Sequence, residues 1–395
     1  MAQTQGIRIG RILGIPIYLD FSWILIFALV TVSLSSNFQT QFSRGGQTEQ
    51  WGLAVGLGVL TSLLFFSSVV FHELAHSVVA QHYKIKVISI TLFLFGGLAR
   101  IGREPTKAMQ EFNIAIAGPI ASAFLAAVFF GVTVVFQENA TVKAVTDPLW
   151  SANLALALFN LLPGFPLDGG RIFRAMVWGA TKDFGRATRV AAASGKLIAY
   201  VMIGFGIYAA LAGSKGGPIV ESIGRWNAIW LAFIGWFLLT AAQASVSQLT
   251  IRETLTGLRA ADVMSHEVPT IPGNMSLEEY SGEVLRTGRR IHIVTMDDRL
   301  VGLMNVAALN QVPRDEWGLN SVQAVMVPRE NILWASPEEP LPRLLERLMG
   351  ADVNQMPVVR HTEDGSAHII GMVTRDAILR VIQTRSELGA ALSGR

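Results

Sequence analysis

The sequence predicts a polytopic α-helical membrane protein that is followed by a smaller soluble α/β domain. Of its 395 residues, 51% are hydrophobic and only 15% are charged, and the mean hydropathy is +0.42. Soluble proteins carry about 25% charged residues. Charge also changes along the chain, with 17 Lys and Arg against 10 Asp and Glu up to residue 250, and 15 against 19 beyond it. The first part is therefore cationic and apolar, whereas the second is acidic and polar enough to be soluble.

Six apolar runs in the first part are candidates for crossing a bilayer, which takes about 20 residues of helix. They cover approximately residues 21–34, 53–80, 112–136, 149–162, 190–212 and 226–246. The fourth run is short and is ended by prolines. A signal peptide is the alternative for the first run, although Pro16 and Asp20 interrupt its apolar core. We therefore expect about six transmembrane helices.

Lys and Arg residues gather in every second connection between these runs. They occupy the segment before the first run and the connections after the second and the fourth, namely Arg8, Arg11, Lys84, Lys86, Arg100, Arg103, Lys107, Arg171, Arg174, Lys182, Arg186 and Arg189. Because cationic connections stay on the cytoplasmic side, both termini are expected in the cytoplasm. These connections also account for the pI near 9.3, so no nucleic-acid partner is expected. The lack of an organelle-type targeting segment favours a prokaryotic plasma membrane.

The connection after the second run is rich in β-forming residues between positions 87 and 101, and Gly96 and Gly97 break it. An open sheet edge is not tolerated in lipid, so this segment is expected to be a membrane-associated β-hairpin that packs on protein or lines a cavity. A free edge there could bind an extended substrate by strand addition. An ordinary interfacial hairpin is the alternative.

An HExxH motif lies inside the second apolar run. In a helix, His72 and His76 are one turn apart on the same face and can bind one zinc ion, with Glu73 beside them as a base. An ionisable side chain near the bilayer centre costs about 2.5 to 3.5 kcal/mol, so this group needs a partner such as a metal. Because the chain has no cysteine, any zinc must take nitrogen and oxygen ligands. The motif predicts a hydrolytic zinc site within the membrane.

A candidate third ligand follows the fourth apolar run. Prolines and glycines between Asn160 and Gly170 break the helix and can turn a side chain inward. Asp168 is the only acidic residue between Asp147 and Asp183. Since a catalytic zinc takes three protein ligands plus water, we predict that Asp168 completes the site. A helix cap or an ion-pair partner for a nearby arginine is the alternative role.

Four motifs together resemble the site-2 protease family of intramembrane zinc metalloproteases: HExxH, the Asn160–Gly170 segment, Phe95-Gly96-Gly97 and Ala117-Gly118-Pro119. The resemblance covers roughly residues 6–215 and implies hydrolysis of peptide bonds within or near the transmembrane segments of substrate proteins. By position it implies zinc ligation by His72, His76 and Asp168 and catalysis by Glu73. Supporting roles are expected for Gly96, Gly97 and Asn160, although Asn160 could equally hold the broken helix together.

The second part of the chain contains an internal repeat. Residues 261–264 and 323–326 are offset by 62 positions, whereas Gly302 and Gly371 are offset by 69, because a polar insertion at 361–367 lengthens the second copy. Each copy is expected to contain a helix, two strands and another helix, with the insertion as a hairpin loop. This pattern resembles a tandem pair of cystathionine-β-synthase (CBS) motifs at 258–312 and 319–383.

These observations predict four parts of the chain: a transmembrane metalloprotease domain at 1–250, a linker at 251–257, a cytoplasmic CBS pair at 258–383 and a tail at 384–395. The CBS resemblance implies regulation of the neighbouring domain, binding of an adenine nucleotide and association into a homodimer. Thr374 and Asp376 match the nucleotide-binding pattern, with Asp376 on the ribose. A helix cap at Thr374 is the alternative. The first copy has Asn305 and Ala307 at these places, so at most one nucleotide site is expected.

The leading hypothesis is therefore an intramembrane zinc endopeptidase that acts on membrane-embedded proteins and is regulated by its CBS pair. The first alternative is a CBS-regulated transporter in which the histidines and Asp168 bind a translocated ion. Glu73 argues against it, because a transport site needs no base beside the first histidine. The second alternative is a zinc-binding scaffold without protease activity.

Overall fold

A computed structural model describes residues 6–44, 51–94, 96–213, 217–296, 299–351, 353–361 and 367–393. The described chain divides into two compact units, one up to Leu249 and one that begins at Thr250. Phe95 of the glycine motif and positions 362–366 of the expected hairpin loop lie outside the described residues.

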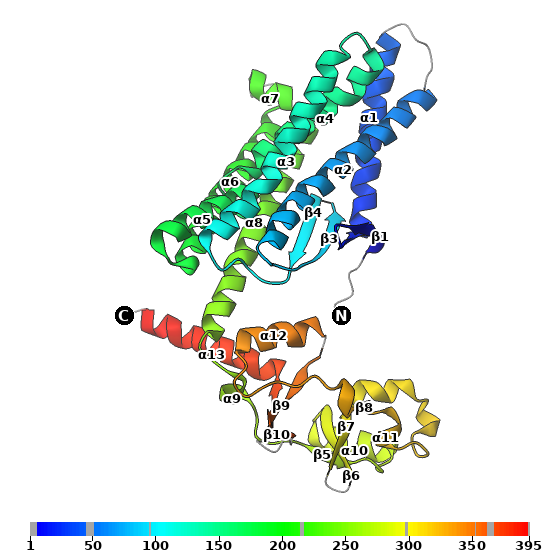
Figure 1. Ribbon diagram of the computed structural model, residues 1–395, viewed down its shortest axis with the longest axis vertical. Coiled ribbons are helices and arrows are strands. Elements are labelled where there is room, and N and C mark those ends of the chain that lie inside the picture. The colour runs from blue at the N-terminus through cyan, green and yellow to red at the C-terminus, as the bar shows by residue number, and fades with distance from the viewer. Residues whose placement is uncertain are drawn as a thin grey trace. The chain divides into compact units, whose positions relative to one another are not determined.

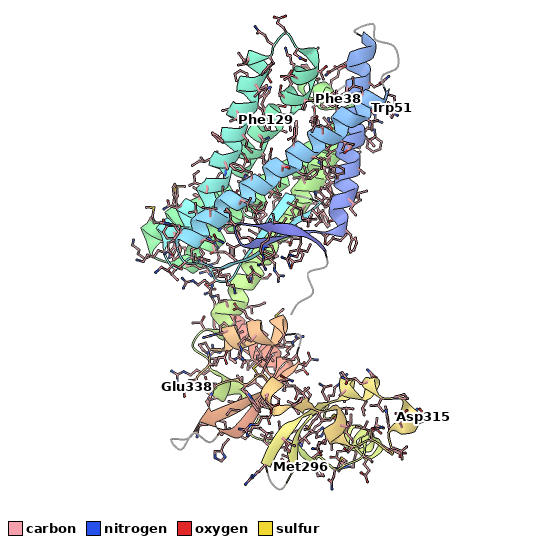
Figure 2. The ribbon with its side chains drawn as sticks, turned by 45° about the vertical axis from the view of Figure 1, so that its right-hand side comes forward. Phe38, Trp51, Phe129, Met296, Asp315 and Glu338 are labelled. Carbon is pink, nitrogen blue, oxygen red and sulfur yellow. The ribbon has the colours of Figure 1, made fainter. Side chains whose placement is uncertain are left out.

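The first unit is built mainly from long helices (Figure 1). They are α1 Phe21–Arg44, α2 Trp51–His82, α3 Ala108–Val135, α4 Ala140–Asn160, α5 Asp168–Thr181, α6 Phe184–Ala212, α7 Pro218–Ile223 and α8 Arg225–Leu255. Many large apolar side chains on their outer faces are exposed, including Leu25 at 65% and Leu197 at 66%. Figure 2 labels one of these exposed side chains, Trp51 at the start of α2, which is 57% exposed. An apolar outer surface is what contact with lipid requires.

Among the described residues, five helices are long and apolar enough to cross a membrane: α1, α2, α3, α6 and α8. Helix α4, which corresponds to the fourth predicted run, falls outside this set because it contains polar residues. Two of these are paired with neighbouring helices, since Thr146 Oγ1 lies 2.6 Å from Thr133 Oγ1 of α3 and Asn153 donates to Ser68 Oγ of α2 at 3.3 Å. The sequence-based count of six therefore differs from the five apolar helices by α4.

The predicted hairpin is part of a larger sheet. Strands β3 Val87–Phe93 and β4 Gly96–Ile101 pair antiparallel. β2 Ile15–Leu19 pairs parallel to β3, and β1 Ile7–Ile12 pairs antiparallel to β2. The sheet order is β1-β2-β3-β4, so within the described part of the chain β4 has one unpaired edge. The sheet packs through Ile90 against Ala80 of α2 and Ile114 of α3.

The second unit contains two similar halves. The first half has α9 Ala260–Val263, β5 Thr270–Pro272, α10 Leu277–Thr287, β6 Ile291–Met296 and β7 Arg299–Asn305, followed by the 3-10 helices η2 Val306–Gln311 and η3 Arg314–Glu316. The second half has α11 Val322–Val325, β8 Val327–Pro328, η4 Arg329–Asn331, α12 Leu341–Gly350, β9 Gln355–His361, β10 Ala367–Thr374 and α13 Arg375–Ser393. Each half has its own buried core.

The two halves exchange their leading segments. Leu341, at the start of α12, donates its main-chain N–H to Leu258 O at 2.9 Å, and Leu277, at the start of α10, donates to Asn320 O at 3.0 Å. The segment at the start of each half is thus bound by the longer helix of the other half, α12 or α10. This reciprocal pairing holds the repeat together as one body.

Candidate metal centre

Helix α2 supplies two histidines to a buried site. His72 and His76 are one turn apart on the face that packs on α3, and their exposed fractions are 3% and 5%. The two Nε2 atoms lie 3.2 Å apart. The two side chains lie on one helix face because they are four residues apart, which is about one helical turn.

The third donor comes from the start of α5. Asp168 Oδ2 lies 3.1 Å from Nε2 of His72 and 3.1 Å from Nε2 of His76. Asp168 is the first residue of α5, and the glycines that follow it allow a close approach. A Cβ at Gly169 would lie 2.3 Å from Leu161 C, and one at Gly170 would lie 2.3 Å from Gly164 C. The helix can therefore begin directly against the loop that precedes it.

The three donor atoms fit a zinc ion. Tetrahedral ligands at about 2.0 to 2.1 Å from zinc are about 3.3 Å from one another, close to the separations of 3.1 and 3.2 Å seen here. Two imidazoles and one carboxylate form a ligand set of the catalytic zinc type. Among the described residues, this trio is the group of His and carboxylate side chains that could hold a metal ion.

Helix α3 holds both imidazole rings from the side away from Asp168. Ser122 Oγ lies 2.8 Å from His72 Nδ1, and His76 Nδ1 lies 2.6 Å from Ile114 O. A carbonyl oxygen can only accept, so Nδ1 of His76 carries the proton and Nε2 has a lone pair for a metal. Gly118 lies between these two residues on α3, and a Cβ there would be 2.2 Å from His76 Nε2.

Strand β4 passes close to Glu73. A Cβ on Gly97 would lie 2.3 Å from Glu73 Cγ and 3.0 Å from its Oε1. Gly96 has a φ of +130°, which favours glycine. The two glycines thus let β4, the last strand of the sheet among the described residues, lie directly against the carboxylate next to the histidines.

Two further residues near the proposed ligands, Asn160 and Arg171, differ in the contacts they make. Asn160 is the last residue of α4, and no hydrogen bond of its side chain is found within the described chain. Arg171, on the first turn of α5, places Nη1 4.0 Å from Asp168 Oδ1. Ser122 and Ile114 were not predicted, because their contacts with the histidines span 50 and 38 positions and leave no local pattern.

Comparisons with known proteins show the family to which the chain belongs. The model of peptidase family M50 matches residues 60–152 and 138–205. A Synechocystis sp. protein named as a zinc metalloprotease, sll0528, is 33% identical over 387 residues and covers 96% of both chains. Rip3 of Mycobacterium tuberculosis, also named as a zinc metalloprotease, is 33% identical over 96% of this chain and 93% of its own. This chain belongs to peptidase family M50, the site-2 protease family.

The M50 peptidase is therefore an intramembrane zinc metalloprotease and a membrane protein. A solved structure of a site-2 protease from Methanocaldococcus jannaschii is 32% identical and covers 61% of this chain and 95% of that chain, with a TM-score of 0.42. The CBS family model matches residues 322–384, the second half of the C-terminal unit.

In this CBS half of the M50 peptidase, Thr374 and Asp376 lie at the junction of β10 and α13. Thr374 Oγ1 accepts a hydrogen bond from Ala377 N at 3.0 Å, so it caps the helix. Asp376 is exposed in the first helical turn. Asn305 in the first half makes the matching cap, accepting from Ala308 N at 2.9 Å. The capping role considered as the alternative for Thr374 is thus present in both copies.

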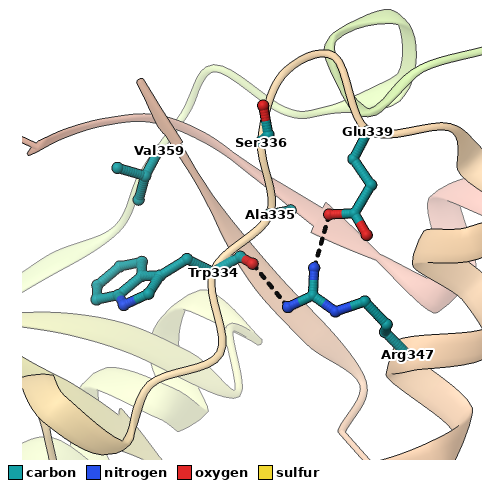
Figure 3. A pocket seen from close by; sticks show the side chains of 6 residues that line it. All are labelled: Trp334, Ala335, Ser336, Glu339, Arg347 and Val359. Carbon is teal, nitrogen blue, oxygen red and sulfur yellow. Dashed lines mark hydrogen bonds and ion pairs between the residues drawn. The ribbon is translucent and has the colours of Figure 1, made fainter. Parts of the chain in front are cut away.

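A cavity of about 270 Å³ lies elsewhere in the second half, and its lining is shown in Figure 3. Its arginine, Arg347, donates to Glu339 at 2.6 Å and to Trp334 O at 2.8 Å. Because Glu339 already neutralises this guanidinium, the cavity offers no unpaired charge from Arg347 to an anion. Thr374 and Asp376 are not among its lining residues.

Proposed function

We propose that His72, His76 and Asp168 bind the catalytic zinc of this protease and that Glu73 is its general base. The observation that carries the proposal is the convergence of the three donor atoms within 3.1 to 3.2 Å of one another. Zinc in such a site polarises the scissile carbonyl and lowers the pKa of water toward 7. Glu73 is adjacent to His72 on α2, so its carboxylate can take a proton from the attacking water and deliver it to the leaving nitrogen.

We further propose that the unpaired edge of β4 binds the substrate. Strand β4 contacts Glu73 at Gly97, and one of its edges is unpaired among the described residues. Main-chain pairing with such an edge binds an extended peptide with little selection of its side chains. A transmembrane helix of a substrate protein has to unwind locally to present such a strand. Cleavage would therefore favour substrates with helix-breaking residues near the cut.

The test replaces Glu73 by Gln. The variant should fold and keep zinc but lose cleavage, and uncut membrane proteins should accumulate when proteomes of cells with the two forms are compared. His72→Ala should in addition lose zinc. If Glu73→Gln cut a confirmed substrate at the wild-type rate, the assignment would be wrong. If wild-type protein bound zinc but cut nothing while moving ions across vesicles, the transporter alternative would replace it.

We propose that α4 is the sixth membrane crossing, which leaves both termini in the cytoplasm. Its 21 residues are about 31 Å long as an α-helix, and its polar side chains Thr146 and Asn153 are paired with α3 and α2. The cysteine-free chain permits single-cysteine labelling. With a membrane-impermeant maleimide on intact cells, Glu138→Cys should react and Arg314→Cys should not; reaction of both would contradict this topology.

We propose that the CBS pair regulates the protease through α8, which belongs to both units of the chain. Within the first unit, Leu238 of α8 packs on Leu167, the residue before Asp168. At the end of the same helix, Leu255 is fully buried in the core of the second CBS half. Insertion of two glycines after residue 249 should leave cleavage intact but remove its response to any CBS ligand. An unchanged response would exclude α8 as the route.

For that ligand we propose one adenine nucleotide at the second CBS half. The exposed carboxylate of Asp376 is free to accept bonds from ribose hydroxyls, and Thr374, whose oxygen accepts from Ala377, still has a hydroxyl proton to donate to a phosphate. Thermal-shift titration of the full chain with ATP, ADP and AMP tests this. A shift that disappears in Asp376→Asn supports the site, and no shift with any nucleotide removes it.

We also propose that the CBS pair forms a homodimer. Leu285 on α10 and Met349 on α12 occupy matching positions of the two halves, and their exposed fractions are 85% and 61%. Exposed apolar residues at equivalent places form a two-fold repeated patch that a second copy can cover. Sedimentation in detergent should show a dimer that Leu285→Glu with Met349→Glu converts to a monomer; a wild-type monomer would contradict it.

A further inference from the structure

A buried ion pair joins α3 to α5. Glu111, in the first turn of α3, is fully buried, and Arg174 of α5 is 8% exposed. Arg174 Nε donates to Glu111 Oε1 at 2.7 Å, and its Nη2 donates to the same oxygen. The guanidinium carbon lies 4.7 Å from the ring centroids of both Phe165 and Phe184.

Stability alone does not account for this arrangement. Burial of two charges costs desolvation energy that their attraction offsets only with good geometry, and apolar residues of similar size are often as stabilising or more so. What a buried pair adds is a fixed relative position of the two side chains that form it. A planar guanidinium that lies over two aromatic rings and bonds a carboxylate has little freedom to shift or rotate.

The pair lies between the elements that bring the metal ligands together. Glu111 is one turn before Ile114, whose carbonyl oxygen accepts from His76 Nδ1. Arg174 is six residues after Asp168 on α5. Helix α3 thus orients the histidines and, through Glu111, also binds the helix that carries the carboxylate.

We propose that Glu111 and Arg174 are positioning residues of the metal centre. Their pairing sets the placement of α5 on α3, and this places Asp168 Oδ2 at equal distances from the two histidines. Neither residue belongs to the proposed ligand set of His72, His76 and Asp168. The proposal rests on the ligand set proposed above, and Asp168→Asn tests that set separately.

The experiment uses the full-length protein in detergent with four variants of the pair: Glu111→Gln, Arg174→Met, Arg174→Lys, and Glu111→Leu with Arg174→Met. Zinc affinity is measured by competition with a chelator, and the visible spectrum of the Co²⁺-substituted protein reports the geometry of the ligands. Arg186→Met, which removes an exposed cation at the start of α6, is the matched control. Thermal unfolding of each variant reports the fold.

Each single variant should weaken zinc binding about tenfold or more, as loss of outer contacts to a metal site does, and should change the cobalt spectrum. Arg174→Lys should not rescue, because an ammonium lacks the planar fork. The double variant shows whether the pair positions the metal ligands or only stabilises the fold. It should melt near the wild-type temperature, yet bind zinc as weakly as the single variants do. Arg186→Met should match wild type.

Wild-type affinity and spectrum in the single variants would overturn the proposal. So would a double variant that regains wild-type affinity, or one that fails to fold, since the pair would then serve the fold alone. If Asp168→Asn bound zinc as tightly as wild type, the ligand set itself would be wrong, whatever the pair variants showed.

Discussion

Ser122 Oγ on α3 lies 2.8 Å from Nδ1 of His72 on α2, and both residues are buried. The contact leaves Nε2 of His72 to face His76 and Asp168. A ring held at one nitrogen cannot flip without losing that bond, so the histidine keeps the orientation in which its other nitrogen is a ligand.

Ser122→Ala should weaken zinc binding about 10- to 100-fold, because it removes an outer contact of a metal ligand. It also leaves a buried imidazole nitrogen without a partner, which costs about 1 to 3 kcal/mol of folding free energy. Chelator competition and thermal unfolding measure the two effects. Ser67→Ala, which removes an exposed hydroxyl on α2, is the control. Equal zinc affinity in both variants would contradict the role of Ser122.

Gly118→Ala should abolish zinc binding and cleavage. The added Cβ would lie 2.2 Å from Nε2 of His76 and 2.5 Å from Nε2 of His72, so the rings would have to leave the positions in which they meet Asp168. Gly131→Ala on the same helix is a matched control, because nothing lies within 4 Å of its added Cβ. It should keep activity and gain about 0.5 to 1 kcal/mol of stability. Normal zinc content in Gly118→Ala would show that the site does not need this close contact between α3 and the two rings.

Gly97→Ala should separate catalysis from metal binding. Its Cβ would lie 2.3 Å from Glu73 Cγ, so the side chain of Glu73 must move while the histidines need not. We expect cleavage to fall at least tenfold at unchanged zinc content. A well-placed general base contributes about 10²- to 10⁴-fold to the rate of the reaction, and displacing it removes part of that contribution. Gly10→Ala on β1, where the added Cβ meets nothing within 4 Å, should behave as wild type. Loss of zinc from Gly97→Ala would argue that β4 supports the metal ligands instead.

The C-terminal unit should lose stability as the pH falls below about 6.5. His292 on β6 is 2% exposed, and its ring packs edge-on against Tyr280. Neither ring nitrogen has a hydrogen-bond partner among the residues that the structure describes. Burial lowers the pKa of His292 below its ordinary value of 6.5, while the charge of Glu283 partly opposes this. The unfolded chain therefore binds a proton at a higher pH than the folded one, and acid favours unfolding.

His292→Met tests this, because Met356 fills the equivalent core position of the second half and is fully buried. The melting temperature of the variant should exceed that of the wild type by a margin that grows from pH 7 to pH 5. All other titrating groups are shared by the two proteins, so the difference isolates His292. A margin that does not change with pH would exclude this histidine as the cause.

Features that depend on local pattern are predictable from the sequence alone. A spacing of four places His72 and His76 on one helix face, apolar runs of sufficient length make membrane helices, and β-forming residues around Gly96 and Gly97 make the hairpin β3–β4. Each of these follows from interactions between residues close in the chain, so each leaves a period or a composition that can be recognised.

The repeat in the C-terminal unit shows what local sequence patterns do not reveal. The glycines at 302 and 371 are landmarks of the repeat in the sequence, but the reason for them is tertiary. A Cβ at Gly302 would lie 2.8 Å from Val327 O, and one at Gly371 would lie 2.7 Å from Ser265 O. Val327 on β8 of the second half passes against Gly302 of the first, and Ser265 of the first half passes against Gly371 of the second. These contacts between the halves are not visible in either copy alone.

The metal centre depends on tertiary packing in the same way. The sequence supplies the three candidate ligands, but the folded chain is needed to bring Asp168 to the histidines across 92 and 96 positions. Folding also gives α3 the contacts of Ser122, Ile114, Gly118 and Glu111, and it joins the N-terminal strands to the hairpin in one sheet. The physical reason is that packing selects such contacts by shape and by the pairing of buried polar groups, and neither leaves a periodic signal along the chain.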